Sequence, residues 1–494
     1  MADGCSSFFI RMGLEPASEN LRKGKIKKKT MTSYMLRQGR NLTYLLALSV
    51  VLLGGAYQTA EAATLCVNPA GSGGCSKTIG AAVLLAKPND TIRVAPGTYN
   101  EDVNISAPLA LAGAGRESTV INAKGLANGI FIHGTNSVVV AGFTVRNANF
   151  QGILVENASA VTITDNIVID NDQSLNVSGA APMCPGMPTA LATGEGEDCG
   201  EGINLTAVDH SIVAHNIIAR NAGGILVSDD TGPTHDNLIT GNLVAENPFD
   251  CGITLASHTA VTGGVYRNTI SNNESSNNGL QLPGEGAGVG LFAAGPGDAT
   301  YANHIIHNRL TGNGLTGVAI HNHAAPGFGT VPAQAPPVNL NDNVIAGNYI
   351  AGNHADTGDS ATAGPTGINV FGVGPITGTV ISGNVIKDEY IDIAVNTPEL
   401  PTATSSTPPQ VDIHLNNLLG ENYGVESLST GTIDARENWW GCAGGPGAER
   451  CSSAKPTTLL TTPWLTKLLN DDGDQNRDDQ NRNDDGHHNW DDHR

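Results

Sequence analysis

The sequence predicts an all-β fold, a single-stranded right-handed parallel β-helix of about ten coils, and three observations lead to this prediction. Short apolar strands recur between asparagines, a glycine-led strand recurs once per period, and large rings are scarce. Aromatic residues make up 4% and charged residues 15% of the 494 residues, while glycine reaches 61. Such a chain builds its core from stacked small and β-branched side chains, which is typical of repetitive β architectures.

The asparagine repeat has the form apolar-x-x-Asn-x-apolar-x-x-Asn, as in ITDNIVIDN and IIHNRLTGN. Asparagine tolerates a left-handed turn, and its amide can bond to the amide one coil above, so stacked asparagines mark solenoid corners. The pattern places these residues in one column: Asn166, Asn216, Asn242, Asn268, Asn308, Asn348 and Asn384. A second column follows five residues later: Asn171, Asn221, Asn247, Asn273, Asn313 and Asn353.

The glycine-led repeat has the form Gly-apolar-x-apolar. It begins at Gly129, Gly152, Gly202, Gly224, Gly252, Gly288, Gly317 and Gly367. Its shortest period, from Gly202 to Gly224, is 22 residues, which is enough for three short strands and three turns. A helical repeat would need a 3.6-residue pattern, which is absent, so we expect parallel β-strands.

The start of the chain has the order of a secretory signal: a basic run at 22–29, an apolar stretch at 44–56 and the site Ala60-Glu61-Ala62. The apolar stretch is shorter than the about 20 residues that span a bilayer, so we expect no stable membrane insertion. The sequence predicts these regions: 1–62 basic N-region and signal peptide, 63–102 N-terminal cap and first strands, 103–440 parallel β-helix, 441–469 C-terminal cap and 470–494 disordered acidic tail.

Charge limits the partners. After cleavage the chain would keep 17 basic and 43 acidic residues, a net charge of −26. This charge argues against nucleic acid and anionic membranes, and a polyanionic substrate would need a bridging cation. We expect a monomer that is secreted, either extracellular or at the cell envelope.

Seven cysteines would remain after cleavage. Three pairs are close in sequence, and an exported chain meets oxidising conditions, so we expect three local disulfides. The pairs are Cys66 with Cys75, Cys184 with Cys199 and Cys442 with Cys451. Cys251 is left over and is expected to be a buried thiol.

Two segments carry a family resemblance. Thr78–Ala123, with its Pro-Gly-Thr-Tyr turn, resembles the opening of pectin-lyase-like β-helix proteins, in which a short helix plugs the solenoid; Thr78 would be the N-cap. Glu437–Gly447 (ENWWGCAGGPG) is similar to the terminal motif of bacterial β-helix repeat proteins, including those called NosD-like. The resemblance covers roughly 63–465 and implies that Trp439 and Trp440 cover the last coil. It implies no single activity, because this fold carries lyases, hydrolases, epimerases and adhesins.

Coil lengths vary in a pattern. Insertions at 172–201, 274–287 and 354–366 precede a glycine-led strand, and those at 295–303, 324–340 and 396–410 follow one. Loops on both sides of one sheet would form walls, and the sheet would be the floor of a groove. Elongated polysaccharides bind in such grooves.

Candidate catalytic residues follow the glycine-led strands. Aligning the coils puts Asp230, His258 and His323 in one column, with Asp229 and His321 in nearby columns. Adjacent coils are about 4.8 Å apart, so Asp230 should face His258 directly, with His323 about 10 Å further on. An aspartate beside a histidine orients the imidazole for general acid–base work, and the same residue types could hold a divalent metal such as calcium. An alternative is that these are ordinary polar turn residues.

Two functions therefore remain open. One is a polysaccharide lyase, hydrolase or epimerase with a histidine base and Asp230 as its orienting carboxylate. The other is a non-catalytic exported module that binds glycans or the cell envelope. The motifs of pectin methylesterases, pectate lyases, polygalacturonases and alginate epimerases are incomplete or absent. Copper handling, which the NosD-like resemblance suggests, ranks third because the chain has no Met/Cys cluster for soft copper.

Overall fold

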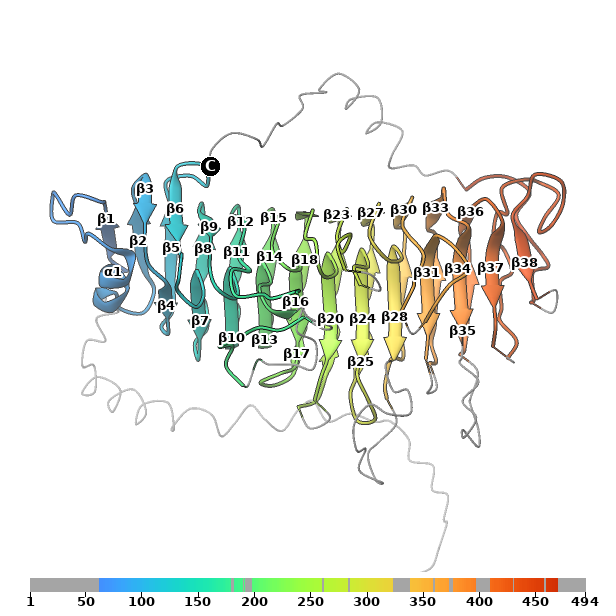
Figure 1. The fold of residues 1–494 in the computed structure, drawn as a ribbon, viewed down its shortest axis with the longest axis horizontal. Helices are drawn as coiled ribbons and strands as arrows, with labels where there is room; N and C mark the ends of the chain where they lie inside the picture. Colours follow the sequence, from blue (N-terminus) through green and yellow to red (C-terminus); the bar gives the residue numbers. More distant parts are fainter. Residues whose placement is uncertain are drawn as a thin grey trace, which may run out of the picture. The chain divides into compact units, whose positions relative to one another are not determined.

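The computed structural model describes residues 62–469, apart from 179–181, 190, 192–197, 260–261, 283–284, 323–337, 359, 373–375, 397–408, 430 and 457–458. Within these residues the chain forms three all-parallel sheets and one α-helix, stacked as a right-handed parallel β-helix (Figure 1). The predicted fold class is confirmed. The predicted signal peptide up to residue 61 and the predicted acidic tail, 470–494, lie outside the described residues.

Each coil contributes one strand to each of three sheets. Sheet A has twelve strands: β1 (Thr64–Val67), β2 (Asp90–Val94), β5 (Leu109–Gly113), β8 (Val139–Ala141), β11 (Thr162–Thr164), β14 (Ile212–Ala214), β18 (Leu238–Thr240), β22 (Thr269–Ser271), β26 (His304–Ile306), β29 (Val344–Ala346), β32 (Thr379–Ser382) and β35 (Val411–His414). Sheet B has eleven strands: β3 (Gly97–Tyr99), β6 (Thr119–Asn122), β9 (Thr144–Arg146), β12 (Ile167–Ile169), β15 (Ile217–Ala219), β19 (Leu243–Ala245), β23 (Glu274–Ser276), β27 (Arg309–Thr311), β30 (Tyr349–Ala351), β33 (Val385–Lys387) and β36 (Asn417–Leu419).

Sheet C has fifteen strands. Twelve form its main path: β4 (Val103–Ile105), β7 (Ile130–His133), β10 (Ile153–Ser159), β13 (Ile203–Asp209), β16 (Ile225–Ser228), β20 (Ile253–Ser257), β24 (Val289–Ala293), β28 (Val318–Asn322), β31 (Thr366–Phe371), β34 (Ile391–Asn396), β37 (Tyr423–Ser427) and β38 (Ser453–Lys455). Three short strands extend the end of β13: β17 (Thr234–His235), β21 (Val265–Tyr266) and β25 (Thr300–Tyr301). The glycine-led repeats are the strands of sheet C, and Ile203 pairs with Ile225 exactly one 22-residue period later.

Asparagine ladders hold the corners, and there are three of them rather than the two that the sequence predicts. In each step the Nδ2 of one asparagine donates to the Oδ1 of the next. The first ladder is Asn166, Asn216, Asn242, Asn273, Asn308, Asn348, Asn384, Asn416 and Asn438. The second is Asn171, Asn221, Asn247, Asn278, Asn313 and Asn353, and the third is Asn237, Asn268, Asn303 and Asn343.

The columns predicted for Asn268 and Asn273 are therefore wrong by one corner. The sequence pattern assigns Asn268 to the first column, but it lies in the third ladder, and assigns Asn273 to the second column, but it lies in the first ladder. Their coil reads VYRNTISNNESSNN and carries asparagine at all three corners, so a two-column pattern fits it in two registers. The left-handed residue is also not the ladder asparagine but the one before it. Asp165, His215 and Asp236 have φ of 56°, 58° and 56°. The side-chain amide of the ladder asparagine instead forms hydrogen bonds with groups of the neighbouring coils.

Sheets A and B differ from sheet C in burial. Strands of sheets A and B alternate, as in β18 and β33, with one buried residue between two half-buried ones. In β20, β24 and β28 all residues are buried. A small apolar cluster covers the outer face of these strands; it comprises Leu226, Cys251, Ala256, Ala287, Phe292, Leu315 and Ala319. This part of sheet C is therefore buried on its outer face as well as toward the core.

The first helix, α1 (Ile79–Leu85), contacts β1, β2 and β4. Thr78 is its N-cap, as predicted, and accepts a hydrogen bond from the Ala81 amide. The Glu101 carboxylate accepts from the amides of Ile79 and Gly80, both at 2.8 Å. Glu101 therefore satisfies backbone donors at the helix start, where a negative charge is also favourable.

All three predicted disulfides are present, Cys66–Cys75, Cys184–Cys199 and Cys442–Cys451, and Cys251 is a buried free thiol. Disulfides of this kind indicate an extracytoplasmic location. Among the described residues, no helix is long and apolar enough to cross a membrane. Trp440 is fully buried in the core and Trp439 is half-buried.

Candidate active site beside His258

The end of β20 and the turn after β16 bring His258 and Asp230 together. The Nδ1 of His258 lies 2.8 Å from Asp230 Oδ1. Ser228 donates to the other oxygen of Asp230 at 2.6 Å, which fixes the carboxylate. The two residues lie in adjacent coils, as the alignment predicted. Their side chains are only 9% and 4% exposed.

Asp229 lies under the same turn and is fully buried. Its Oδ1 accepts from the His258 amide at 2.8 Å. Its Oδ2 accepts from the hydroxyls of Ser257 and Thr262, at 2.8 and 2.7 Å. Because three donors bind this carboxylate, Asp229 is suited to positioning the His258 backbone rather than to exchanging a proton.

A loop that the sequence alignment did not include supplies a second carboxylate. Asp198 Oδ2 lies 3.7 Å from His258 Nε2, so the imidazole has an aspartate on each side. Asp198 precedes Cys199 of the disulfide with Cys184. The disulfide closes the long insertion 172–201, which thereby returns to the solenoid beside His258.

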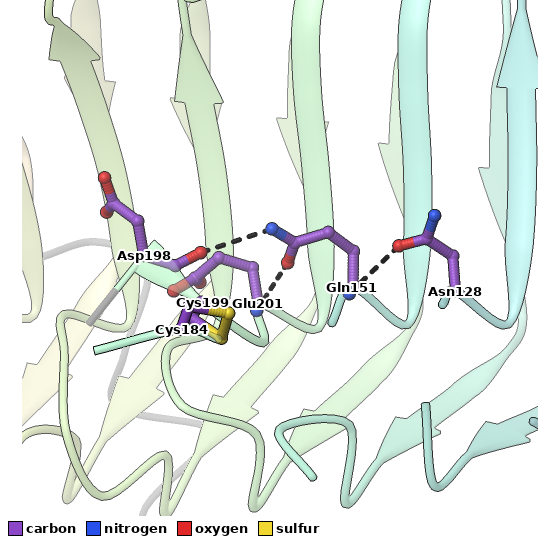
Figure 2. Close-up of a disulfide and its surroundings, with 6 residues drawn as sticks. All are labelled: Asn128, Gln151, Cys184, Asp198, Cys199 and Glu201. Carbon is purple, nitrogen blue, oxygen red and sulfur yellow. Dashed lines mark hydrogen bonds between the residues drawn. A yellow bond between two sulfur atoms is a disulfide. The ribbon is translucent and has the colours of Figure 1, made fainter. Parts of the chain in front are cut away.

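Gln151 anchors this loop from the preceding coil (Figure 2). Its Nε2 donates to the Asp198 carbonyl at 3.2 Å, and its Oε1 accepts from the Glu201 amide at 2.6 Å. Its own amide donates to Asn128 Oδ1 at 3.2 Å. Gln151 is fully buried, so these bonds fix the segment from Asp198 to Glu201 against the coils.

Three buried carboxylates meet at the end of this segment. Ligand oxygens of Asp198, Glu201 and Asp250 all lie within 4.8 Å of one another. Glu201 lies against Gly223, where a Cβ would approach its Oε1 to 2.5 Å. Carboxylate oxygens suit calcium or magnesium, and these are the described residues that could hold the cation considered from sequence. Asp250 precedes a glycine-led strand by two residues, but nothing in the pattern distinguishes it from a turn aspartate.

Asp298 adds a further acid near His258. It is 5% exposed, and its Oδ2 accepts from the Gly295 amide at 2.6 Å. Burial, opposed by that hydrogen bond and reinforced by the charge of Asp229, raises the pKa of Asp298 to about 6. Asp298 thus changes its protonation state in the range where a histidine does.

His321 does not belong to this cluster. It lies on β28, two coils from His258, and its register partners are Phe292 and Phe371, whose rings make edge contacts with it. Its Nε2 lies 2.9 Å from Ser360 Oγ and 3.2 Å from Asp356 Oδ2. Ser360 also donates to Asp356. The structure therefore does not bring His321 to Asp230, and His323 lies outside the described residues.

The network around His321 differs from a nucleophile–base–acid relay. The aspartate approaches Nε2, and the serine hydroxyl also lies nearer to Nε2 than to Nδ1, at 2.9 and 3.4 Å, whereas a relay would place the two groups on opposite nitrogens. All three side chains are buried. The network holds the loop 354–366 onto β28.

Comparison with known proteins adds a family match. Residues 87–282 match the family described as "Periplasmic copper-binding protein (NosD)". The chain is a right-handed parallel β-helix protein with a NosD-like segment. That segment is less than half of the chain and includes Asp230 and His258. No curated protein matches the sequence.

Solved β-helix structures resemble this β-helix protein at low identity. The A-module of mannuronan C-5 epimerase AlgE6 from Azotobacter vinelandii is 14% identical, with a TM-score of 0.42 and coverage of 79% of this chain and 95% of that one. The Dettilon tailspike protein is 12% identical, with a TM-score of 0.47 and coverage of 74% and 61%. An alginate lyase from Paenibacillus sp. is 14% identical, with a TM-score of 0.38 and coverage of 65% and 94%.

Proposed function

We propose that this chain is an exported β-helix protein that binds a polysaccharide and modifies it at His258, by cleavage or epimerisation. The observation that carries the proposal is the placement of His258 between Asp230 at Nδ1 and Asp198 on the Nε2 side. An imidazole oriented by a carboxylate is the commonest arrangement for moving a proton at neutral pH. Three segments that are distant in sequence converge to build it.

In this proposal Asp230 fixes the ring orientation and His258 exchanges a proton with the sugar. Asp198 stabilises the protonated ring, because the protonated form can donate toward both carboxylates. A uronate substrate would bring negative charge to an acidic site, and a divalent cation at Asp198, Glu201 and Asp250 would offset it. Asp229 positions the backbone and takes no part in the proton transfer.

The second candidate is a non-catalytic exported glycan-binding or cell-envelope module. Burial favours it, since the outer faces of β20, β24 and β28 are covered and the His258 side chain is only 9% exposed. Copper binding, which the description of the matching family suggests, fits less well: the described metal-ligating cluster consists of carboxylates, and copper prefers nitrogen and sulfur ligands.

One experiment separates these functions. The disulfide-intact mature chain is incubated with a panel of uronate and neutral polysaccharides, with calcium or with EDTA, and unsaturated products, reducing ends and C-5 epimerised residues are measured. Asp230→Asn is the matched variant, because it keeps the shape of the side chain and removes its charge. The proposal predicts turnover of at least one polysaccharide and its loss in Asp230→Asn. Binding to a polysaccharide without any product would favour the non-catalytic module.

A further inference from the structure

Two more carboxyl groups are buried four coils further along sheet C, away from His258. Glu389 takes the place of an asparagine at the end of the second ladder. Its Oε1 accepts from both the amide and the Nδ2 of Asn353, at 3.0 and 2.9 Å. The side chain is 0% exposed, so a carboxyl group closes this ladder inside the protein.

Asp392 lies on β34 and is also 0% exposed. Its Oδ2 accepts from the Gly420 amide at 3.0 Å. A Cβ at Gly420 would overlap Asp392 Oδ1, so the glycine makes the space that this carboxyl occupies. The coil that contains Gly420 therefore packs directly onto the acid.

Each carboxyl keeps one oxygen that the backbone and the ladder do not satisfy. Glu389 Oε2 and Asp392 Oδ1 are buried and accept no hydrogen bond from the described residues. The charged groups that act on the pair are acidic: Asp388 acts on Glu389, and Glu389 acts on Asp392. The Lys387 ammonium lies near Asp388, at 3.9 Å, on the exposed side of the turn.

We propose that Glu389 and Asp392 are both protonated at neutral pH and form an alkali-sensitive latch that holds the last coils, β34 to β38, onto the solenoid. A buried carboxylate without a full set of donors is costly, whereas the protonated acid needs less solvation and gains a donor of its own. Rising pH would ionise the pair, and mutual repulsion together with the cost of burial would open this end of the β-helix.

The pKa shifts of the two acids also favour their protonated forms. Burial raises the pKa of Glu389 to about 8, against the hydrogen bonds from Asn353 and with help from Asp388. Burial also raises the pKa of Asp392 well above its usual value, with Glu389 adding to the effect. Both groups bind protons more tightly in the folded chain. For Glu389 this contribution to stability is thus complete below about pH 4 and is lost as pH rises through about 8, and Asp392 acts in the same direction.

The test measures thermal unfolding of the disulfide-intact chain between pH 4 and pH 9. The variant Glu389→Gln/Asp392→Asn keeps both accepting oxygens and cannot ionise. Asp412→Asn is the control, since this acid is exposed on β35 and does not act on either carboxyl of the latch. We expect the melting temperature of the wild type to fall as pH rises, the double variant to lose most of this fall, and the control to keep it.

Hydrogen exchange locates the effect. At pH 9 the amides of β34 and β37 should exchange faster in the wild type than in the double variant, while those of β13 should not differ. A wild-type pH profile identical to that of the double variant would overturn the proposal.

Infrared spectroscopy of the wild type alone provides a second measurement if the double variant does not fold. The proposal predicts the carbonyl band of a buried carboxylic acid at pH 7 and its disappearance toward pH 9. If the band is absent at pH 7 and EDTA lowers the melting temperature, the pair holds a cation rather than protons, and the latch is wrong.

Discussion

His258 and His321 both contact an aspartate on the outer side of sheet C, but their surroundings differ. His258 lies between Asp230 and Asp198, and Asp198 forms a cluster with two further buried acids, Glu201 and Asp250; the His258 side chain is 9% exposed. His321 is 3% exposed and lies between the rings of Phe292 and Phe371. The comparison shows that an aspartate–histidine pair is not enough to indicate chemistry.

What separates the two histidines is the role of the loop that covers each one. The loop over His321 donates and accepts within its own network, so the histidine serves as an anchor for that loop. The loop over His258 is fixed by a disulfide and by Gln151, and it brings the carboxylates of Asp198 and Glu201 close to that of Asp250 despite their like charge. Such a cluster of buried like charges lowers the stability of the fold and is typical of functional sites.

The largest stability effect is expected at His321. His321→Ala would leave a cavity between two aromatic rings and remove a partner of Ser360 and Asp356. We expect a loss of about 3 kcal/mol in the free energy of unfolding. Chemical denaturation with a matched His304→Ala variant, an exposed histidine on β26, measures it. Equal stability of the two variants would mean that His321 is not an anchor.

A ladder asparagine gives the reference value for a purely structural polar group. Asn268 is fully buried, donates to Thr234 and Asn303, and accepts from Asn237. Asn268→Ala should cost about 2 kcal/mol, because buried donors and acceptors in two adjacent coils lose their partners. Asn104→Ala, at an exposed position of β4, is the control and should change the melting curve little.

The sequence predicted the repeated part of the molecule well. Repetition sets the strand spacing, so the contact of Asp230 with His258 follows from aligning glycine-led strands. Asp198 and Glu201 could not be placed in this way, because a long insertion has no register. Their position depends on a disulfide and on Gln151, which looked like an ordinary residue before a glycine-led strand. The burial of sheet C was missed for the same reason, since loops that pack back onto a sheet carry no periodic signal.

A smaller effect is expected at Asp298, and its pH dependence tests the acidic character of the His258 site. Burial raises the pKa of Asp298 to about 6, so folding loses stability as pH rises from about 4 to about 6. Asp298→Asn should be about 1 kcal/mol more stable than the wild type at pH 7.5 and equal to it at pH 4. Denaturation at both pH values measures the difference. A constant difference would show that Asp298 does not titrate in this range.

The central claim is that His258, and not His321, carries out proton transfer on a polysaccharide. The most direct test compares kcat/KM of His258→Gln and His321→Gln on the polysaccharide that the wild type modifies, at a temperature where both variants are folded. The account predicts a loss of at least about 100-fold in His258→Gln, the size of a general acid–base contribution, and near wild-type activity in His321→Gln. Full activity of His258→Gln, or equal losses in both variants, would contradict it.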